Sequence, residues 1–470
     1  MSVINYKNIK LDTIEKVIYN LCLKGNVCLN KTSYCKILSA YKKAKDKTQK
    51  EILSDILKNA KLAHDLKRPL CQDTGQVLVF LEIGQEVLIT GGDLKEGINR
   101  AVEKCYRENC FRKSVVKNAL FERTNTTSNT PAIIYTDIVK GDKVRIDVLI
   151  KGAGSENKSC AVMELPSLCR EELKEEIVNL ILSSGVNACP PLFIGIGLGQ
   201  TLEGAAVLSK KALFRNEMSK EEQDFSEEIK KGLNDKAPKG YKGIYALGVK
   251  MFSSSTHIAS MPLGISINCH SLRELGCTID ENGITYDETI DNFEEIKETE
   301  VRGKEVFTND SSTVRSLKEG ERVFLTGEIY VARDAAHKKM AELMKENKPL
   351  PIKIKDKIIL YAGPCPAKQG EIIGPVGPTT SGRMDRYSFD LYDKGLTGTI
   401  GKGQRSLALT ECIRKNKGIY FSMQGGVASL IQQCVKSAEI IAFPELGAEA
   451  IYKLYVERMP VKVEISGFKE

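Results

Sequence analysis

The sequence predicts two domains, an N-terminal α+β domain and a C-terminal α/β domain. The first reason is length, because 470 residues exceed what one ordinary hydrophobic core organises. The second is that apolar residues recur at helical spacing through the first 65 or so residues and then give way to mixed strands and helices. The third is an alternation of strands and helices beyond about residue 305. We predict domains at 1–285 and 302–470.

The N-terminal domain is predicted to begin with helices, of which 46–66 shows the clearest helical spacing. A hairpin is predicted over 132–150, because two strand-like runs flank a turn at 140–142. The other expected elements are a strand at 76–81, helices at 94–108 and 171–184, and strands at 243–252 and 261–268.

An acidic stretch at 280–305 is poor in large apolar clusters, and we interpret 286–301 as the linker between the domains. The C-terminal domain then alternates strands with helices, the pattern typical of an α/β fold. Strands are expected near 322–331, 356–361, 418–422 and 438–442, and helices at 334–346, 404–415 and 427–436.

Composition excludes several classes of protein. A hydrophobic content of 42% with 28% charged residues is that of a globular protein. The net charge of +8 is spread over the chain, and no long basic tract occurs, so a nucleic-acid surface is not indicated. We find no apolar run long enough to span a bilayer. The first residues lack the pattern of a secretory signal, so we expect a cytoplasmic protein.

The 14 cysteines are spread through the chain, and most are expected to be reduced. No CxxC pair occurs, which argues against a zinc ribbon or a thioredoxin-like site. Three cysteines, Cys71, Cys189 and Cys269, stand at predicted element ends, where side chains from distant segments can converge. Thiolates suit iron–sulfur clusters, and three ligands for four irons leave one iron open as a Lewis acid. The alternative for each cysteine is a small buried hydrophobic residue.

Two glycine-rich stretches follow predicted strands. Residues 151–157 (KGAGSEN) allow backbone N–H groups to approach an anion, although plain turns share this composition. Residues 195–201 (GIGLGQT) form a similar stretch before a helix. They lack the spacing of a dinucleotide fingerprint, so we expect no nucleotide.

Basic and hydroxyl side chains gather in the C-terminal half. Residues 374–385 (GPVGPTTSGRMD) combine hydroxyls and a guanidinium with flexible glycines, and 400–403 (IGKG) place a lysine between glycines. Arg333 lies between a predicted strand and helix, and Arg112 lies in the first domain. Arginine binds a carboxylate through two parallel hydrogen bonds, so this set suits a dicarboxylate. Surface loops and surface ion pairs are the alternatives.

Four histidines occur, at positions 64, 257, 270 and 337. His257 precedes the predicted strand that leads to Cys269, which would bring it within reach of a site at that cysteine. A hydrogen-bonded structural histidine is the alternative.

The motifs described above follow one another along the chain in this order: CQDTG, KGAGSEN, NACPP, THIA with NCH, ARDAAHK, GPTTSGRMD and IGKG. Together they resemble the class I, iron–sulfur-dependent fumarate hydratases and the related L-tartrate dehydratases. The chain to about residue 285 is similar to the family's α portion, and the chain from about 302 is similar to its β portion, here fused. The resemblance implies a swivelling β/α type of fold for the C-terminal domain. It also implies a homodimer in the tricarboxylic acid cycle.

The resemblance further implies that Cys71, Cys189 and Cys269 bind a [4Fe-4S] cluster. It places around the substrate Gln72, Asp73, Arg112, Gly154, His257, Arg333, Thr379, Thr380, Arg383 and Lys402. Asp73 and Thr379 are the candidates for proton transfer, and we assign His257 to the same catalytic group. Ala153 stands where the family often has a third glycine, which is a departure from its pattern.

The expected reaction is the reversible hydration of fumarate to L-malate. Its dehydration direction needs a Lewis acid to ease departure of hydroxide and cationic side chains to stabilise the charge that builds as the proton leaves. An L-tartrate dehydratase needs only a pocket that accepts a second hydroxyl. From other classes, a non-catalytic iron or redox sensor would not need Arg383 and Thr379, and a hydrolase with Cys71 as nucleophile would not need iron.

Overall fold

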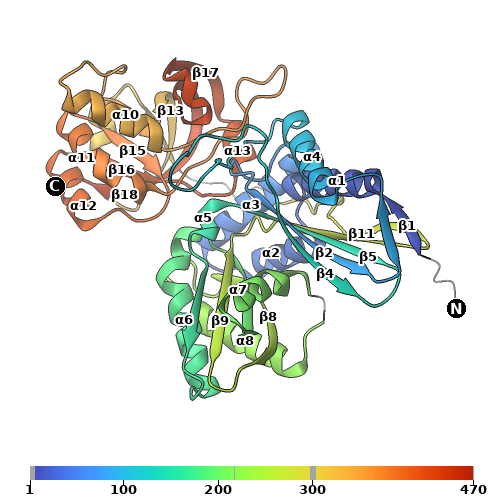
Figure 1. The fold of residues 1–470 in the computed structure, drawn as a ribbon. Coiled ribbons are helices and arrows are strands. Elements are labelled where there is room, and N and C mark those ends of the chain that lie inside the picture. The colour runs from blue at the N-terminus through green and yellow to red at the C-terminus, as the bar shows by residue number, and fades with distance from the viewer. Residues whose placement is uncertain (1–5, 216, 297–302, 469–470) are drawn as a thin grey trace, which may run out of the picture. The chain divides into compact units, whose positions relative to one another are not determined.

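The computed structural model describes residues 6–215, 217–296 and 303–468, and Figure 1 shows its helices and strands. The chain divides into two compact units, Met1–Ile296 and Lys297–Glu470, each with its own sheets and helices. This mixed composition agrees with the predicted α+β and α/β folds. Within the described ranges, no helix combines the length and apolar content needed to cross a bilayer.

Several helices of the first unit begin where the sequence supplies a capping side chain. Asn30 Oδ1 accepts from Ser33 N, and Asp93 Oδ1 accepts from Glu96 N, each at a helix start. The predicted helices at 46–66, 94–108 and 171–184 are confirmed. The helices are α1 (Leu11–Val27), α2 (Lys31–Lys43), α3 (Lys47–Asp65), α4 (Leu94–Glu108), α5 (Ala153–Glu156), α6 (Arg170–Gly185), α7 (Leu202–Lys211) and α8 (Lys220–Asp235), with 3-10 turns η1 (Val186–Ala188) and η2 (Ala212–Phe214).

A five-stranded sheet with the order β11-β10-β5-β2-β4 forms one core of this unit. Alternate residues of β2, such as Val77 and Val79, face α1 and α4, whose apolar sides cover one face of the sheet (Figure 1). A separate pair joins β1 to β3. The strands are β1 (Lys7–Lys10), β2 (Gln76–Gly84), β3 (Val87–Thr90), β4 (Ile133–Val139), β5 (Val144–Lys151), β10 (Glu274–Asp280) and β11 (Gly283–Tyr286).

The predicted hairpin over 132–150 is wrong, although both of its strands exist. β2 lies between β4 and β5, parallel to β4 and antiparallel to β5. The end of β2 is hydrogen-bonded to the residues where these two strands meet their connecting segment: Gly84 N donates to Lys143 O, and Gln85 N donates to Val139 O. A Cβ on Gly84 would lie 2.2 Å from Gly141 O, so only glycine allows this approach.

The second sheet of this unit has the order β6-β9-β7-β8 and carries the second core. Apolar residues of α6 and α8 pack on one face against Ile194 and Ile196 of β7. The strands are β6 (Cys160–Glu164), β7 (Leu192–Gln200), β8 (Ala246–Thr256) and β9 (Met261–Asn268), so the expected strands at 243–252 and 261–268 are confirmed.

Residues 195–201 are not the loop that the glycines suggested, because most of them form β7. Their glycines face α7 on the opposite side from the apolar core. A Cβ on Gly195 would lie 1.9 Å from Ser209 O, and a Cβ on Gly197 would lie 2.1 Å from Ala205 O. The glycines therefore allow α7 to pack against the strand backbone.

The stretch predicted as a linker, 286–301, lies partly outside the described residues, because 297–302 are not described. Its first part is hydrogen-bonded to the first unit: Asp287 N donates to Gly276 O, and Glu288 O accepts from Lys31 N.

The second unit contains a seven-stranded sheet with the order β12-β13-β14-β15-β16-β18-β17. Strands β12 to β16 are parallel, and β18 pairs antiparallel with both β16 and β13, which closes a ring of five strands. The strands are β12 (Lys304–Phe307), β13 (Arg322–Val331), β14 (Ile358–Leu360), β15 (Gly398–Gly401), β16 (Ile419–Ser422), β17 (Val435–Ala442) and β18 (Ile451–Ser466). The four predicted strands correspond to β13, β14, β16 and β17.

Helices of the second unit pack on this sheet through a core that includes Met340, Leu391 and Leu409. The three predicted helices correspond to α10, α12 and α13. The helices are α9 (Ser311–Arg315), α10 (Asp334–Lys345), α11 (Asp385–Asp393), α12 (Leu407–Lys415) and α13 (Ala428–Gln432), with 3-10 turns η3 (Ser381–Met384) and η4 (Pro444–Glu449).

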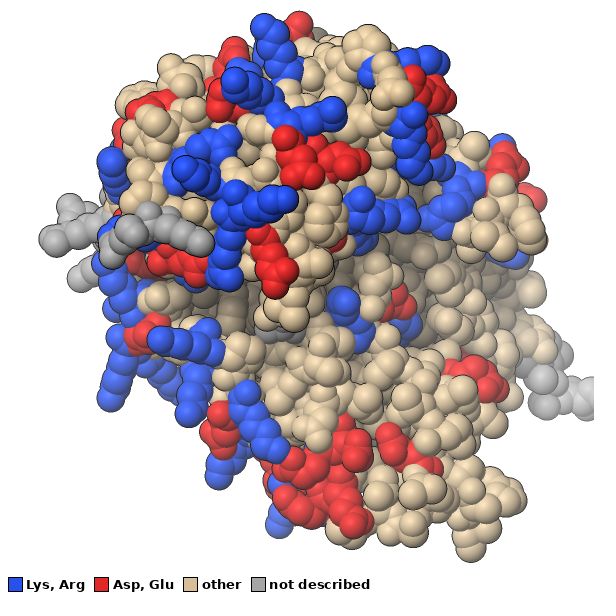
Figure 2. Space-filling view, turned by 90° about the vertical axis from the view of Figure 1, so that its left-hand side faces the viewer, with Lys and Arg blue, Asp and Glu red and all other residues tan. Residues whose placement is uncertain are grey.

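Surface charges of both signs are intermixed. Figure 2 shows Lys and Arg side chains among Asp and Glu side chains over the face that it presents. This agrees with the modest net charge of +8.

Candidate active site

The three predicted cysteines lie at element ends of the first unit. Cys71 precedes β2, Cys189 precedes β7, and Cys269 directly follows β9. The antiparallel register of Phe193 with Asn268 brings the start of β7 beside the end of β9. The pKa of the Cys269 thiol is raised to about 11, mainly by burial and next by the neighbouring charges of Cys189 and Cys71. A further link comes from Arg273, four residues after Cys269, which donates to the backbone oxygen of Asp73, two residues after Cys71.

The donor chemistry of these three cysteines fits an iron–sulfur cluster. Among the residues that the structure describes, no three His, Cys, Asp or Glu side chains are arranged to hold one metal ion. An iron–sulfur cluster spreads its thiolate ligands over separate iron atoms, so its cysteines need not converge on one point. Three soft thiol donors from three separate elements fit such a cluster.

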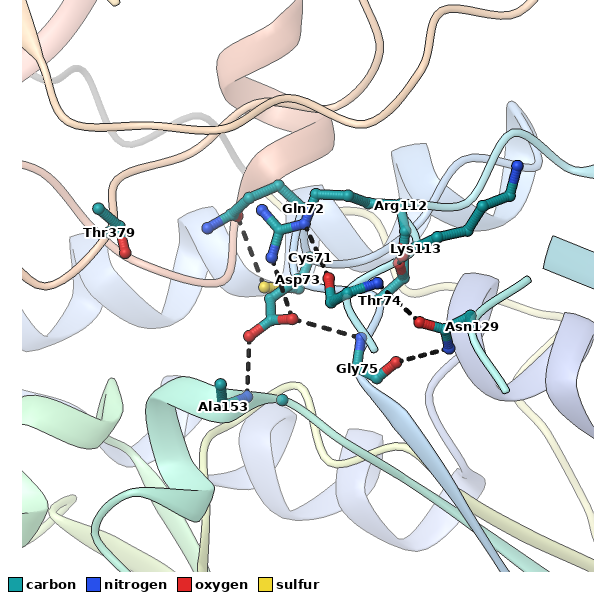
Figure 3. Close-up of polar contacts among 12 residues, drawn as sticks. Cys71, Gln72, Asp73, Thr74, Gly75, Arg112, Lys113, Asn129, Ala153 and Thr379 are labelled. Atoms are coloured by element: carbon teal, nitrogen blue, oxygen red, sulfur yellow. Dashed lines mark hydrogen bonds and ion pairs between the residues drawn. The ribbon is translucent and has the colours of Figure 1, made fainter. Parts of the chain in front are cut away.

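Asp73 is fixed by several contacts beside Cys71 (Figure 3). Its Oδ1 lies 3.1 Å from Arg112 Nη2 and accepts from Gly75 N at 3.3 Å. Its Oδ2 accepts from Ala153 N at 2.9 Å. The carboxylate thus joins the CQDTG turn to Arg112 and to the start of α5.

Gln72 and Gly154 lie next to these contacts. The Gln72 Oε1 atom is 3.5 Å from Cys71 Sγ, and the Gln72 side chain is buried. Gly154 lies in α5, directly after Ala153, whose N–H is taken by Asp73. The KGAGSEN stretch therefore contains a short helix, α5, whose start contacts the CQDTG turn.

Two buried basic side chains outside the predicted set, Arg273 and Lys151, support this arrangement. Arg273 Nη1 donates to Asp73 O at 2.7 Å and to Asn26 Oδ1 at 3.2 Å. Lys151 Nζ donates to Asn268 Oδ1 at 2.6 Å and to Ile267 O. Arg273 thus joins the CQDTG turn, and Lys151 the end of β5, to a segment beside Cys269. The position of Arg273 four residues after Cys269 was the one available signal.

The structure does not bring His257 to Cys269. His257 follows β8 and precedes β9, whereas Cys269 follows β9. The eight residues of β9 therefore separate them, which corresponds to about 25 Å of extended strand. The imidazole Nδ1 accepts from Ala259 N at 3.1 Å in an exposed loop.

In the second unit, the predicted substrate residues follow the ends of neighbouring parallel strands. The register pairs Val331 of β13 with Leu360 of β14, and Leu360 with Ile400 of β15. Carboxyl ends of parallel strands meet at one edge of a sheet, where α/β folds commonly bind ligands. The residues beyond these ends are Arg333 after β13, Thr379, Thr380 and Arg383 after β14, and Lys402 after β15.

Direct contacts join several of these residues. Arg383 Nη2 donates to Thr379 Oγ1 at 2.6 Å and to Asp334 Oδ2 at 3.1 Å. Arg333 Nε also donates to Asp334 Oδ2, at 3.2 Å. Burial alone would raise the pKa of Asp334, but the charges of Arg333 and Arg383 outweigh it and lower that pKa. Asp334 therefore orients two arginines as an ionised carboxylate.

Thr380 and Lys402 are held together by backbone pairing. They form an isolated parallel bridge, with Lys402 N donating to Thr379 O and Ser381 N donating to Lys402 O. The second unit thus gathers its five predicted residues on the adjoining loops at one sheet edge.

Two family models cover nearly the whole chain. The fumarate hydratase model matches residues 15–278, and the fumarase C-terminus model matches residues 281–467. The chain therefore belongs to the fumarate hydratase family, and the predicted resemblance is confirmed. Fumarate hydratases are hydro-lyases, so the prediction of an enzyme of this class is confirmed as well.

Individual relatives agree with the family match. The chain is 32% identical over 446 residues to the anaerobic class I fumarate hydratase of Escherichia coli K12, covering 87% of this chain and 80% of that protein. It is 31% identical over 444 residues to fumarate hydratase 2 of Leishmania major, covering 88% and 78%. Over 271 residues it is 34% identical to a putative L(+)-tartrate dehydratase subunit alpha of Methanocaldococcus jannaschii, covering 54% and 94%.

Proposed function

We propose that the chain catalyses the reversible hydration of fumarate to L-malate, with a [4Fe-4S] cluster held by Cys71, Cys189 and Cys269. The observation that supports this most is that the segments of the three cysteines are joined: strand register pairs Phe193 with Asn268, and Arg273 donates to Asp73 O. Class I fumarate hydratases among the relatives support the choice of substrate. When bound, the cluster would supply an iron with a vacant position, a Lewis acid that eases departure of the hydroxyl group.

The cationic residues are proposed to bind the two carboxylates of the substrate. Arg112, Arg333, Arg383 and Lys402 supply guanidinium and ammonium donors, and arginine matches a carboxylate with two parallel hydrogen bonds. Gln72, Gly154 and Thr380 would add neutral donors beside them. The same cations stabilise the negative charge that builds on a carboxylate as the adjacent carbon loses its proton.

Asp73 and Thr379 are proposed to transfer the proton. Asp73 is an acceptor whose position is set by Arg112 and by two backbone N–H groups. Thr379 accepts a hydrogen bond from Arg383 at 2.6 Å, and a nearby guanidinium favours the deprotonated form of a hydroxyl. We leave open which of the two acts as acid and which as base. His257 stays a proposed member of the catalytic group, although β9 separates it from Cys269 in the same chain.

An L-tartrate dehydratase is the second candidate, and the match to the putative tartrate dehydratase subunit supports it. The sensor and the hydrolase considered from the sequence are set aside, because the chain belongs to a hydro-lyase family.

The test is anaerobic purification, iron and sulfide analysis, and assays with fumarate and L-tartrate on the same sample. We expect about four iron atoms per chain and turnover of fumarate. Turnover of L-tartrate without any turnover of fumarate would reject fumarase in favour of the second candidate. Full turnover of fumarate by iron-free protein would reject the cluster.

Four further features belong to the proposal. We propose a cytoplasmic homodimer, the swivelling β/α type for the second domain, and a boundary between cluster and substrate domains within 286–301. Light scattering on the purified protein tests the dimer, and a monomeric mass at assay concentration would reject it.

A further inference from the structure

A buried tyrosine lies beneath the loops that carry Thr379 and Lys402. Tyr420 on β16 has 1% of its surface exposed. Its hydroxyl donates to Gly403 O at 2.7 Å and lies 3.0 Å from Ser381 Oγ. A phenol carries one proton, so donation to Gly403 leaves the Ser381 hydroxyl to donate to the Tyr420 oxygen.

These two partners belong to two different loops. Ser381 directly follows Thr380, and Gly403 directly follows Lys402. The close approach of the loops depends on Gly401, where a Cβ would lie 1.9 Å from Ser381 Oγ. Tyr420 therefore joins the loop of the threonines to the loop of the lysine by one hydroxyl.

A buried arginine restricts the movement of Tyr420. The Arg405 side chain is fully buried, and its guanidinium lies 5.0 Å from the centre of the Tyr420 ring. Its Nε donates to Asp385 Oδ1 at 2.8 Å, and Asp385 Oδ2 accepts from Ser406 N at 2.7 Å. A buried charge that is hydrogen-bonded in this way is costly to displace, so the ring has a fixed support.

We propose that Tyr420 is a positioning residue for the hydration reaction, because its hydroxyl fixes the spacing between Thr379 and Thr380 on one loop and Lys402 on the other. This role rests on the proposed function, in which these three residues act on the substrate. Tyr420 itself touches no reacting atom. Misplacing a reacting group by about 1 Å can slow a reaction about 100-fold.

The test compares Tyr420→Phe with Tyr392→Phe in the full-length, cluster-containing enzyme. Tyr392 is an equally buried phenol whose hydroxyl lies 2.8 Å from Thr399 Oγ1 and donates to Ile419 O at 2.9 Å, so its partners lie on strands and not on the two loops. Both variants should show a similar fall in unfolding midpoint and the same iron content. We expect kcat to fall about tenfold in Tyr420→Phe and less than about twofold in Tyr392→Phe. Equal kcat values for the two variants would overturn the positioning role.

A second comparison tests the bond to Ser381. Ser381→Ala should lower kcat, and the double variant Tyr420→Phe with Ser381→Ala should be no slower than Tyr420→Phe alone, because both changes break one connection. Losses that multiply in the double variant would contradict a shared connection.

Arg383→Ala separates this inference from the proposed function. If Arg383→Ala abolishes turnover while Tyr420→Phe behaves as Tyr392→Phe, the proposed function stands and the positioning role is overturned. If Arg383→Ala keeps full turnover, the proposed use of this loop fails and the positioning role fails with it.

Discussion

The guanidinium of Arg383 donates to the hydroxyl of Thr379 at 2.6 Å. Arg383 is held in turn by Asp334, which also binds Arg333. The hydroxyl therefore faces a cation whose position is set by a carboxylate. A threonine in such a setting suits proton transfer, because the cation stabilises the oxygen when it is deprotonated.

Thr379→Val is expected to lower kcat by at least about 100-fold, since general acid–base groups contribute factors of this size. Thr379→Ser keeps the hydroxyl and is expected to retain activity within about tenfold of the parent. Steady-state kinetics with fumarate and L-malate measures both. Thr410→Val is the control, because in the contacts described the Thr410 hydroxyl donates to the backbone oxygen of Ser406, the N-cap of its own helix α12. A Thr379→Val variant with near-normal kcat would remove Thr379 from proton transfer.

Arg112→Lys is expected to lower kcat/KM by about 10- to 100-fold, although the charge is kept. The ammonium cannot reproduce the planar donor pair that meets a carboxylate, and it also changes the support of Asp73. Arg100→Gln is the control, since Arg100 pairs with Glu15 on the surface and such pairs contribute about 0–1 kcal/mol. If Arg112→Lys matched the control in kcat/KM, Arg112 would have no role in binding the substrate or in orienting Asp73.

The sequence predicted elements whose signals are local. The helix expected at 94–108 is α4, because Asp93 caps its first turn and its apolar residues recur at helical spacing. The hairpin at 132–150 was wrong because pairing is not local: β2, some fifty residues earlier in the chain, inserts between the two strands. The sequence carries no signal for that insertion beyond the glycine at position 84.

The residues of the candidate site divide in the same way, into those that local motifs mark and those that only distant contacts bring in. Cys71, Asp73 and Thr379 stand in local motifs that carry the resemblance to the family, so the sequence marked them. Lys151 was not marked, because its partner Asn268 is 117 residues away in the chain. Tyr420 was not marked either, since its partner Ser381 is 39 residues earlier and an isolated tyrosine in a strand looks like ordinary core.

Gly195→Ala is expected to destabilise the first unit by about 2–3 kcal/mol, because the new Cβ would meet the backbone oxygen of Ser209 and force α7 away from β7. Chemical denaturation measures the loss. Gly232→Ala in α8 is the control: its Cβ would meet a Val178 methyl at 3.1 Å, and alanine favours a helix by about 1 kcal/mol over glycine. Equal stability of the two variants would contradict the close packing of α7 on the strand.

Glu274 makes stability depend on pH. The pKa of Glu274 is raised to about 7, mainly by burial. The charge of Lys250 lowers this pKa, and the carboxylates of Asp147 and Asp287 raise it. The folded chain therefore keeps a proton between pH 4.5 and about 7 that the unfolded chain has lost. The contribution of Glu274 protonation to the free energy of unfolding is therefore complete below pH 4.5 and is lost as the pH rises through about 7.

Glu274→Gln removes this titration and keeps an oxygen for the Asn30 amide, which donates to Glu274 Oε1 at 2.7 Å. The variant is expected to be more stable than the parent at pH 8 by about 1–3 kcal/mol and to match it near pH 5. Denaturation at both pH values measures the difference. A constant difference at the two pH values would show that the effect is packing and not protonation.

A serine in place of any one of Cys71, Cys189 and Cys269 is expected to remove most of the bound iron and the hydratase activity with it. The reason is that a hydroxyl is a much poorer ligand for iron than a thiolate. Cys35→Ser is the matched control, since Cys35 is exposed on α2 and lies outside the thiol group. Iron and sulfide analysis of anaerobically purified protein measures the loss of iron without reference to activity.

A cluster with an open iron should also be damaged by oxygen, so air should inactivate the parent and release iron. Full iron content in Cys269→Ser, or unchanged activity after long exposure to air, would contradict a cluster held by these three cysteines.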